Sequence, residues 1–369
     1  MWQKLWLSLI SIGMSCCMFA AASAAAGQPA ANPEEKPEAA VNAAAPEVPS
    51  EKIYINLASR SLALYVDGVK VALYPIGPGK VSTPTPVGYY KVLDKTENPE
   101  WIDPEDLTRK VPSGEGNPLG YRWLQFYGTY GIHGTNKPES VGNYVSNGCV
   151  RMKEADVEDL FNHVKVGTPI EITYNRVVIE RMPNHTIVYY IYPDGYHRQA
   201  LDAVTVDKWL EGYGVNAFES DAAIEEKIQA SDGQPTYIAR AYSMEVDGRQ
   251  LAAKAVLKND ICYLPAVPLA EALKVSLSWN PEAAVLVSPY GQVSGTVKKD
   301  LLYFSADDVG TLFHLTGGLT ADGVYEFHSM KPAVVQPVRQ DSTVQVQKAQ
   351  TEAAKSGTGT GTKKANKNK

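Results

Sequence analysis

The sequence predicts a mainly β domain at residues 51–175, followed by a smaller α+β domain toward the C-terminus. Three observations support this division. Apolar and polar residues alternate along residues 52–56 and 61–66, which is typical of half-buried strands. Asp67 and Gly68 form a hairpin-turn signal directly after the second segment. A weak internal repeat near the C-terminus combines a strand with a short helix in each copy.

Residues 1–26 predict a secretory signal. Lys4 precedes an apolar run that ends in small residues suited to cleavage. The run approaches the roughly 20 residues that span a bilayer, so an uncleaved N-terminal membrane anchor is the alternative. Residues 27–50, rich in alanine, proline and glutamate, predict a flexible linker. We therefore expect a secreted protein, periplasmic or in the cell wall.

Charge and cysteine usage limit the partners. The formal net charge of −6 argues against nucleic acid, because phosphate binding needs a clustered basic face. Cys16 and Cys17 lie inside the predicted signal, which leaves Cys149 and Cys262 in the exported chain. These two could form a disulfide in an oxidising compartment. The residues around Cys149 favour a chemical role instead.

The first strands lead into a less regular region. Residues 69–76 should continue the meander as a third strand. Pro84 and Pro86 lack the N–H that a central strand needs, so they predict an edge or a rigid loop before a strand at 89–93. Residues 94–120 carry many polar and turn residues and predict a long loop, of the kind that often forms a lid or substrate wall.

Regular elements return after this loop. Alternation at residues 123–127 predicts a strand, and a further strand should end at His133. A short helix then follows, because apolar residues fall at helical spacing on one face, namely Val157, Leu160, Phe161 and Val164. Residues 169–174 predict the closing strand of the domain.

Residues 133–152, with the sequence HGTNKPESVGNYVSNGCVRM, gather a histidine, a cysteine, an arginine and several glycines. A free thiol has a pKa of about 8.5, so a cysteine nucleophile needs a neighbouring base to be ready near neutral pH. His133 is the nearest candidate. Turn residues fill the chain between His133 and Cys149, which predicts a hairpin-like return that brings imidazole and sulfur within hydrogen-bond reach.

The residues beside Cys149 suit acyl transfer. Gly148 permits a tight backbone, so the amides of Gly148 and Cys149 could point at a developing oxyanion. Arg151 could hold a substrate carboxylate in a bidentate clamp.

The segment SNGCVRM, together with the upstream IHGT, resembles the signature of the YkuD-type L,D-transpeptidases, cysteine enzymes that remodel bacterial peptidoglycan. TPTPVGYY at residues 83–90 is similar to the TPTPxGxF segment that this family carries before its active site. The resemblance covers roughly residues 51–175 and implies a YkuD-like β-sandwich with a short helix. It makes Cys149 the nucleophile and His133 the general base, and it places the oxyanion or substrate contacts at Gly134, Ser146, Asn147, Gly148 and Arg151.

One position departs from the family pattern. Many members carry Ser-His-Gly-Cys, whereas this chain has Asn147 before Gly148. The change leaves nucleophile and base intact, but it puts in doubt any role of a second histidine in orienting substrate.

The resemblance implies attack of the Cys149 thiolate on the third residue of a peptidoglycan stem tetrapeptide, with release of D-alanine. An amine of another stem would then resolve the thioester, forming a cell-wall crosslink. No cofactor and no metal are expected. With water as the acceptor the same residues would make an L,D-carboxypeptidase. A fold that had lost turnover would be a non-catalytic peptidoglycan-binding protein.

Residues 176–240 predict an α/β connecting region whose domain membership is uncertain. No catalytic grouping is visible there. We expect His185 and His197, which lie among turn residues, to be solvated surface histidines. The expected strands and short helices lie at 177–179, 187–191, 206–210 and 222–228.

Residues 258–266 match 298–306 at an offset of forty, and each copy predicts a strand, a turn and a short helix. Ser305 and Asp308 could form a capping box in the second copy. Residues 243–330 resemble the copper amine oxidase N-terminal-like domain of exported bacterial proteins, a name that implies no metal site.

The repeat also predicts the environment of the second cysteine, Cys262. Cys262 aligns with Leu302, so we expect it to be a buried apolar residue. Cys262 and His314 do not form a metal-ligand set of the usual spacing. Residues 333–369, which end in KKANKNK, predict a disordered basic tail.

Overall fold

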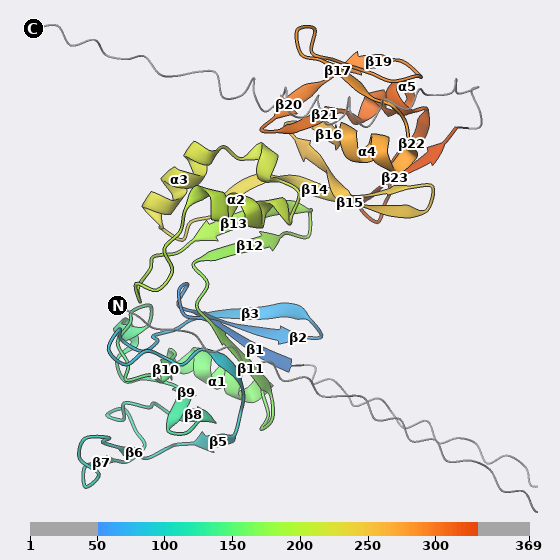
Figure 1. Ribbon diagram of the computed structural model, residues 1–369. Coiled ribbons are helices and arrows are strands. Elements are labelled where there is room, and N and C mark those ends of the chain that lie inside the picture. The colour runs from blue at the N-terminus through green and yellow to red at the C-terminus, as the bar shows by residue number, and fades with distance from the viewer. Residues whose placement is uncertain (1–50, 331–369) are drawn as a thin grey trace, which may run out of the picture. The chain divides into compact units, whose positions relative to one another are not determined.

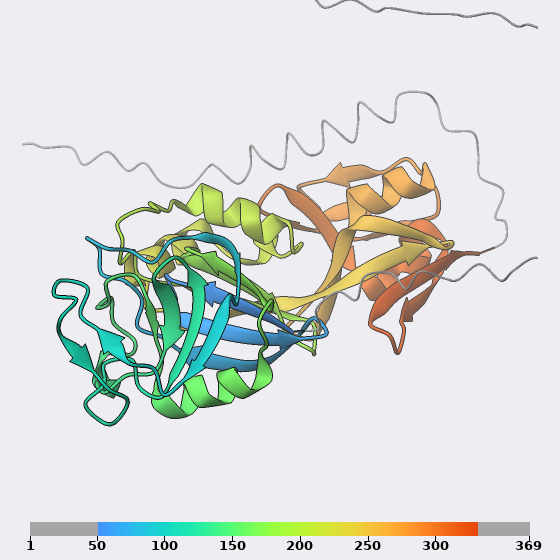
Figure 2. The same cartoon turned by 90° about the horizontal axis from the view of Figure 1, so that it is seen from below.

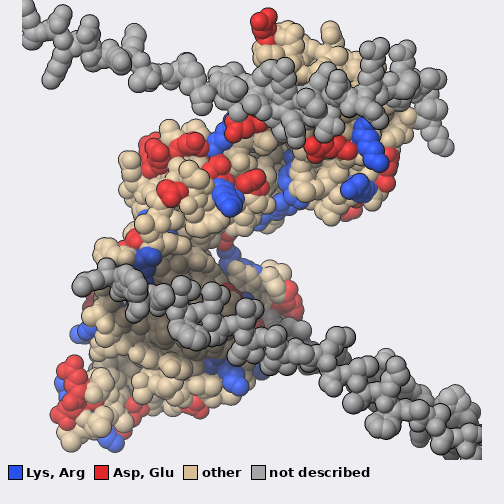
Figure 3. Space-filling model, viewed as in Figure 1, with Lys and Arg blue, Asp and Glu red and all other residues tan. Residues whose placement is uncertain are grey.

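The computed structural model describes residues 51–330. The predicted signal at 1–26, linker at 27–50 and tail at 333–369 lie outside the described residues. Within the described part, no helix is long and apolar enough to cross a membrane. Figure 3 shows acidic and basic side chains interspersed over the visible face of the described residues.

The N-terminal unit opens with the predicted antiparallel meander of β1 (Glu51–Asn56), β2 (Ser61–Val66) and β3 (Val69–Pro75). Asp67 and Gly68 adopt φ values of 50° and 77°, as a tight hairpin turn requires. These strands belong to a five-stranded sheet with the order β3-β2-β1-β11-β4 (Figure 1).

The other two strands of this sheet close the domain. β11 (Pro169–Thr173) pairs parallel to β1, and β4 (Gly88–Lys91) forms the edge beside it. The loop that carries Pro84 and Pro86 precedes this edge strand, as proline chemistry predicts.

A second sheet has four strands in the order β10-β9-β8-β5. They are β5 (Asp94–Glu97), β8 (Arg122–Tyr127), β9 (Tyr130–His133) and β10 (Val150–Arg151). The 94–120 region is therefore not one long loop, because it contributes β5 and the small β6–β7 pair (Trp101–Ile102 and Lys110–Val111).

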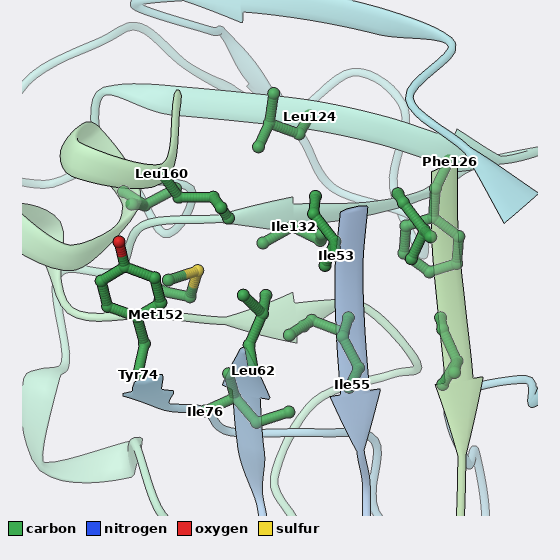
Figure 4. Packing of buried hydrophobic residues seen from close by; sticks show 14 of the residues in the cluster. Ile53, Ile55, Leu62, Tyr74, Ile76, Leu124, Phe126, Ile132, Met152 and Leu160 are labelled. Atoms are coloured by element: carbon green, nitrogen blue, oxygen red, sulfur yellow. The ribbon is translucent and has the colours of Figure 1, made fainter. Parts of the chain in front are cut away.

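The two sheets and helix α1 (Glu154–His163) enclose one core. Figure 4 shows Ile53 and Ile55 of β1 packed toward Leu124 and Ile132 of the second sheet. The predicted apolar face of α1 is buried in the same cluster, and Figure 2 shows this green helix lying beside the strands. A mainly β sandwich with a short helix is thus confirmed for the N-terminal unit.

The C-terminal region forms the largest sheet of the described residues, and this sheet also includes strands of the 176–240 region. Nine strands take part, and seven of them follow the order β12-β13-β14-β15-β16-β21-β20. These seven strands are β12 (Val177–Arg181), β13 (Thr186–Ile191), β14 (Thr236–Val246), β15 (Arg249–Lys258), β16 (Ile261–Pro265), β20 (Thr296–Lys298) and β21 (Leu301–Ser305).

The remaining two strands extend this sheet from β14. β23 (Val324–Ser329) pairs parallel to β14, and β22 (Leu315–Leu319) pairs antiparallel to β23. A separate three-stranded sheet contains β17 (Ser278–Asn280), β18 (Val285–Val287) and β19 (Gln292–Ser294).

The 176–240 region is continuous with this C-terminal sheet, because β13 pairs with β14. Helices α2 (Ala203–Glu211) and α3 (Asp221–Ala230), at the predicted positions, pack on it around Val206, Leu210 and Ile224. The same cluster includes Val256 of β15 and Tyr303 of β21. One core therefore joins the connecting region to the repeat.

The repeat is visible in the backbone. β16 leads into α4 (Ala266–Leu273), and β21 leads through a 3-10 turn, η3 (Ala306–Asp308), into α5 (Val309–Phe313). Both helices end in the left-handed region, at Lys274 with φ 56° and His314 with φ 54°. β16 and β21 pair with each other, so the two copies share one sheet.

Three smaller expectations need correction. Ser305 caps η3 by accepting from the Asp307 amide at 3.4 Å, so the capping box with Asp308 is absent. Cys262 is only partly buried against the core. His185 is also partly buried, with its ring centroid 4.8 Å from that of Tyr242, because it packs over the sheet rather than projecting into solvent.

Candidate active site

The pairing of β9 with β10 brings the predicted site residues together. The strands are parallel, with Ile132 opposite Val150 and His133 opposite Arg151. Ile132 and Val150 are fully buried in the sandwich core. Because side chains alternate along a strand, His133 and Arg151 point to the other face. Cys149 lies in the bend two residues before Arg151, directly before β10. The return between the strands is therefore a parallel crossover, and the expected hairpin-like return is wrong.

The His133 imidazole is buried, and its environment favours the neutral form. Its Nδ1 lies 2.6 Å from the carbonyl oxygen of Gly134. A carbonyl only accepts, so Nδ1 carries the proton and Nε2 keeps a free lone pair. Burial lowers the pKa of His133 to about 4, and the Arg151 guanidinium also lowers it, while the bond to Gly134 opposes the shift.

Two flanking residues orient this imidazole. The Trp123 ring stacks on His133 with ring centroids 5.8 Å apart and an interplanar angle of 26°. Gly131 leaves room for that indole, because a Cβ there would come within 2.6 Å of it. The indole therefore restricts the imidazole to one orientation.

The Cys149 sulfur lies at the turn between β8 and β9. Its thiol donates to the carbonyl oxygen of Thr129 at 3.8 Å. Burial raises the pKa of Cys149 above its ordinary value, whereas the Gly131 amide and the Arg151 guanidinium lower it. Burial therefore favours the neutral form of both the thiol and the imidazole.

Gly148 is required by both conformation and space. Its φ is 115°, a region that residues with side chains rarely adopt, and a Cβ there would lie 2.2 Å from the Tyr130 ring. The Tyr130 ring thus fixes the position of the turn that carries Cys149.

Ser146 shapes this turn from within. Its buried hydroxyl donates to the Cys149 carbonyl at 2.5 Å and accepts from the Gly148 amide at 3.0 Å. The Gly148 amide is therefore not free to bind an oxyanion as expected. No described residue accepts a hydrogen bond from the Cys149 amide, which leaves that amide as the available donor.

Arg151 is a partly buried cation beside the sulfur. Its backbone pairs with Gly77, and Nη1 donates to Ser140 Oγ at 3.4 Å. Burial lowers the pKa of Arg151, and Cys149 raises it. Across residues 51–330 no carboxylate forms an ion pair with Arg151, so the guanidinium is available to a substrate anion.

The remaining predicted residues have different roles. Asn147 is exposed next to the turn. Gly134 is buried, and a Cβ there would lie 2.2 Å from the Glu154 carboxylate, which accepts from the Tyr121 amide at 2.7 Å. Glu154 thus packs against the loop that contains Gly134, whose carbonyl accepts from His133.

Sequence reasoning missed Gly131, Trp123, Tyr130 and Glu154 as parts of the site. Gly131 carried a usable signal, because it lies two residues before His133 and thus on the same strand face. Within the described residues Cys149 and Cys262 are free, and no group of three His, Cys, Asp or Glu side chains could hold a metal ion.

Comparison with known proteins identifies the N-terminal unit. The sequence model of the YkuD family, described as an L,D-transpeptidase catalytic domain, matches residues 50–172. Putative L,D-transpeptidase YqjB of Bacillus subtilis is 40% identical over 128 residues, which cover 33% of this chain and 70% of YqjB. Probable L,D-transpeptidase YcfS of Escherichia coli is 34% identical over 156 residues, which cover 38% of this chain and 49% of YcfS.

A solved L,D-transpeptidase from Mycobacterium smegmatis aligns with 34% of this chain and 58% of its own, at 21% identity and a TM-score of 0.30. The family match ends at residue 172, so the C-terminal sheet is not assigned to any domain type. The chain belongs to the YkuD-type L,D-transpeptidases, enzymes that act on peptidoglycan stem peptides outside the cytoplasm, and residues 50–172 are its catalytic domain.

Proposed function

We propose that the protein crosslinks peptidoglycan with Cys149 as the nucleophile and His133 as the general base. One observation supports this assignment, namely the register of β9 and β10, which sets His133 opposite Arg151, two residues after Cys149. The Gly134 carbonyl holds the His133 proton on Nδ1 and leaves Nε2 to accept the thiol proton.

In the first half-reaction the thiol proton passes to His133 Nε2 as the sulfur attacks the carbonyl carbon of the third stem residue. Deprotonation accompanies attack, because burial favours the neutral form of both the thiol and the imidazole. The Cys149 amide donates to the oxyanion, an interaction worth about 3 to 4 kcal/mol in other acyl-transfer enzymes. The C–N bond then breaks, and His133 returns the proton to the leaving D-alanine amine.

In the second half-reaction an amine of another stem attacks the thioester. His133 takes the proton of that amine, the new amide bond forms, and the C–S bond breaks. The Gly131 amide and the Arg151 guanidinium stabilise the leaving thiolate, because both favour the charged form of Cys149. Protonation of the sulfur by His133 restores the neutral pair.

Arg151 is proposed to bind the terminal carboxylate of the donor stem. Its guanidinium lies beside the sulfur and has no carboxylate partner among residues 51–330. A planar guanidinium can bind a carboxylate through two parallel hydrogen bonds, which fixes the orientation of the peptide end. Asn147, exposed beside the turn, would contact substrate at the rim of the site.

The wider assignments follow from the family and the sequence. The chain would be exported by residues 1–26, or anchored by them if they are not cleaved, and would work in the periplasm or cell wall. Residues 243–330 would form the copper amine oxidase N-terminal-like domain, a proposal that the forty-residue repeat in sheet and helices supports.

The test is D-alanine release from a disaccharide tetrapeptide by purified protein. Cys149→Ala should abolish release, since the other described thiol, Cys262, lies in β16 of the C-terminal sheet. Cys262→Ala is the matched control and should retain full activity, because that thiol lies in the C-terminal sheet. Full release by Cys149→Ala would refute the assignment.

The same reaction distinguishes the acceptors. Mass analysis of the products with a second stem peptide present should show a crosslinked dimer. Production of the tripeptide alone would identify water as the acceptor and make the protein an L,D-carboxypeptidase. Absence of both products, together with an unmodified Cys149, would indicate a non-catalytic binding protein.

A further inference from the structure

A second site lies in the C-terminal sheet, where the two turns of the repeat meet. A cavity of about 380 Å³ opens there. One wall comes from Lys258 at the end of β15 and the turn after it. Another comes from Lys298 at the end of β20 and Lys299 in the matching turn. The cavity is closed by the 3-10 turn η2 (Asn216–Phe218) and the residue after it.

The cavity lining is predominantly basic, since it contains three lysines and a single carboxylate, Glu219. Lys299 is neutralised by ion pairs with Asp207 and, at 2.7 Å, with Asp221. Lys258 donates one of its three N–H groups to the Phe218 carbonyl at 2.7 Å. Two further donors of Lys258 therefore remain for a ligand.

Lys298, like Lys258, is a cavity cation without a carboxylate counter-ion among the described residues. No carboxylate of residues 51–330 forms an ion pair with it. Its Nζ lies 4.6 Å from the centroid of the Tyr263 ring and 5.2 Å from that of Phe218. These aromatic faces hold the ammonium in place, so little conformational entropy remains to be lost when an anion binds.

Glu219 is the group that an incoming anion would meet. Burial raises the pKa of Glu219, while Lys258 and Lys299 lower it. No described side chain makes an ion pair with this carboxylate. A negatively charged Glu219 would repel a bound anion in the same cavity, so Glu219 should oppose anion binding.

We propose that this cavity binds a small hydroxylated ligand carrying a carboxylate or phosphate group, with Lys298 and Lys258 as its cationic contacts. The volume suits a ligand of about the size of one sugar ring. Ser220 and Asn259, which also line the cavity, offer a hydroxyl and an amide to the ligand hydroxyls. This site is independent of the transpeptidase reaction.

Titration calorimetry on the intact protein tests the proposal with three probes, namely glucuronate, glucose 6-phosphate and uncharged glucose. We expect binding of at least one charged sugar and none of glucose. Preference between the two charged probes identifies carboxylate or phosphate as the recognised group. Equal binding of glucose, or no binding of either charged sugar, would overturn the proposal.

Three variants locate the binding. Lys298→Gln should lower the affinity for the charged sugar about tenfold or more, as loss of a charge-assisted contact predicts. Glu219→Gln should strengthen it, because the competing carboxylate is gone. Lys208→Gln, which removes an exposed charge on α2 outside the cavity, should leave affinity unchanged.

Circular dichroism and D-alanine release would verify the fold of each variant. If folded Lys298→Gln binds like the unaltered protein, or Glu219→Gln binds more weakly, the assignment of this cavity is wrong. Failure of D-alanine release in every variant and in the unaltered protein would count against the transpeptidase proposal instead.

Discussion

The two free cysteines of the described residues lie in contrasting surroundings. Burial raises the pKa of both thiols. At Cys149 two neighbours act against burial, namely the Gly131 amide and the Arg151 guanidinium. At Cys262 the Tyr325 hydroxyl lowers the pKa, but the Asp307 carboxylate raises it, and the result is about 11. Burial is thus common to both cysteines, and a cation is found only beside Cys149.

The backbone differs as well. Cys262 occupies the regular five-residue strand β16, where it lies opposite Leu257 of β15. Cys149 precedes the two-residue strand β10 and follows Gly148, whose φ is 115°. This irregular turn leaves the Cys149 amide without a protein acceptor among the described residues, and an oxyanion requires such a donor. Reactivity therefore depends on the turn as much as on the sulfur.

The largest expected effect comes from removing the base. His133→Gln should lower the rate of thioester formation by about 100- to 10,000-fold, because general base catalysis typically contributes that much. Cys149 would then be nearly as inert as Cys262. Mass spectrometry of the acyl-enzyme at short reaction times would measure the rate.

His163→Gln provides the matched control for this experiment. His163 lies on α1 with a side chain that is 52% exposed, and it touches Asp159 rather than the site. Its replacement should leave the rate within about twofold of the unaltered protein, as for most surface substitutions. Retention of most of the rate by His133→Gln would require a different base.

Local patterns predicted most of the N-terminal elements. Alternation and the Asp67-Gly68 turn located the first meander, and the spacing of Val157, Leu160 and Phe161 located α1. β5 escaped prediction because its sequence, DKTE, is polar and no residue of it is fully buried. The pairing of polar strands is decided by neighbours that lie far away in the sequence.

For the site, residue chemistry was predictable and geometry was not. Cys149, His133 and Arg151 were proposed from their types and spacing, and the β9–β10 register sets His133 opposite Arg151. The parallel direction of β10 carries no local signal, since that strand has two residues. The competition of Ser146 for the Gly148 amide likewise depends on a turn conformation that a sequence pattern does not specify.

A smaller effect on activity is expected from Gly148→Ala. This variant tests whether the irregular backbone at Cys149, in contrast to the regular strand at Cys262, is needed for reactivity. The new methyl group would collide with the Tyr130 ring at 2.2 Å and would also disfavour the φ of 115°. We expect a loss of about 1 to 3 kcal/mol in unfolding free energy and about a tenfold or greater loss of activity from displacement of the nucleophile.

Gly167→Ala separates the two causes. Gly167 has a φ of 94°, but a Cβ there would meet no atom within 4 Å. This variant should therefore lose only the unfolding free energy that the positive φ costs an alanine, and it should keep its activity. Urea unfolding and D-alanine release would be measured on both proteins, and equal losses of activity would show that the Tyr130 contact is irrelevant.

The smallest effect is a shift in the acid limb of kcat/KM, which tests the influence of Arg151 on the site. The active form needs neutral His133, whose pKa is about 4. Activity should therefore persist as the pH falls from 7 to about 5 and decline only near 4, whereas an ordinary histidine would lose half of its base form near pH 6.5. Arg151→Gln removes a cation that lowers this pKa, so its acid limb should move to higher pH. An acid limb near pH 6.5 in the unaltered protein, unmoved by Arg151→Gln, would show that neither burial nor Arg151 controls the pKa of His133. The difference between Cys149 and Cys262 would then depend on the turn at Gly148 alone.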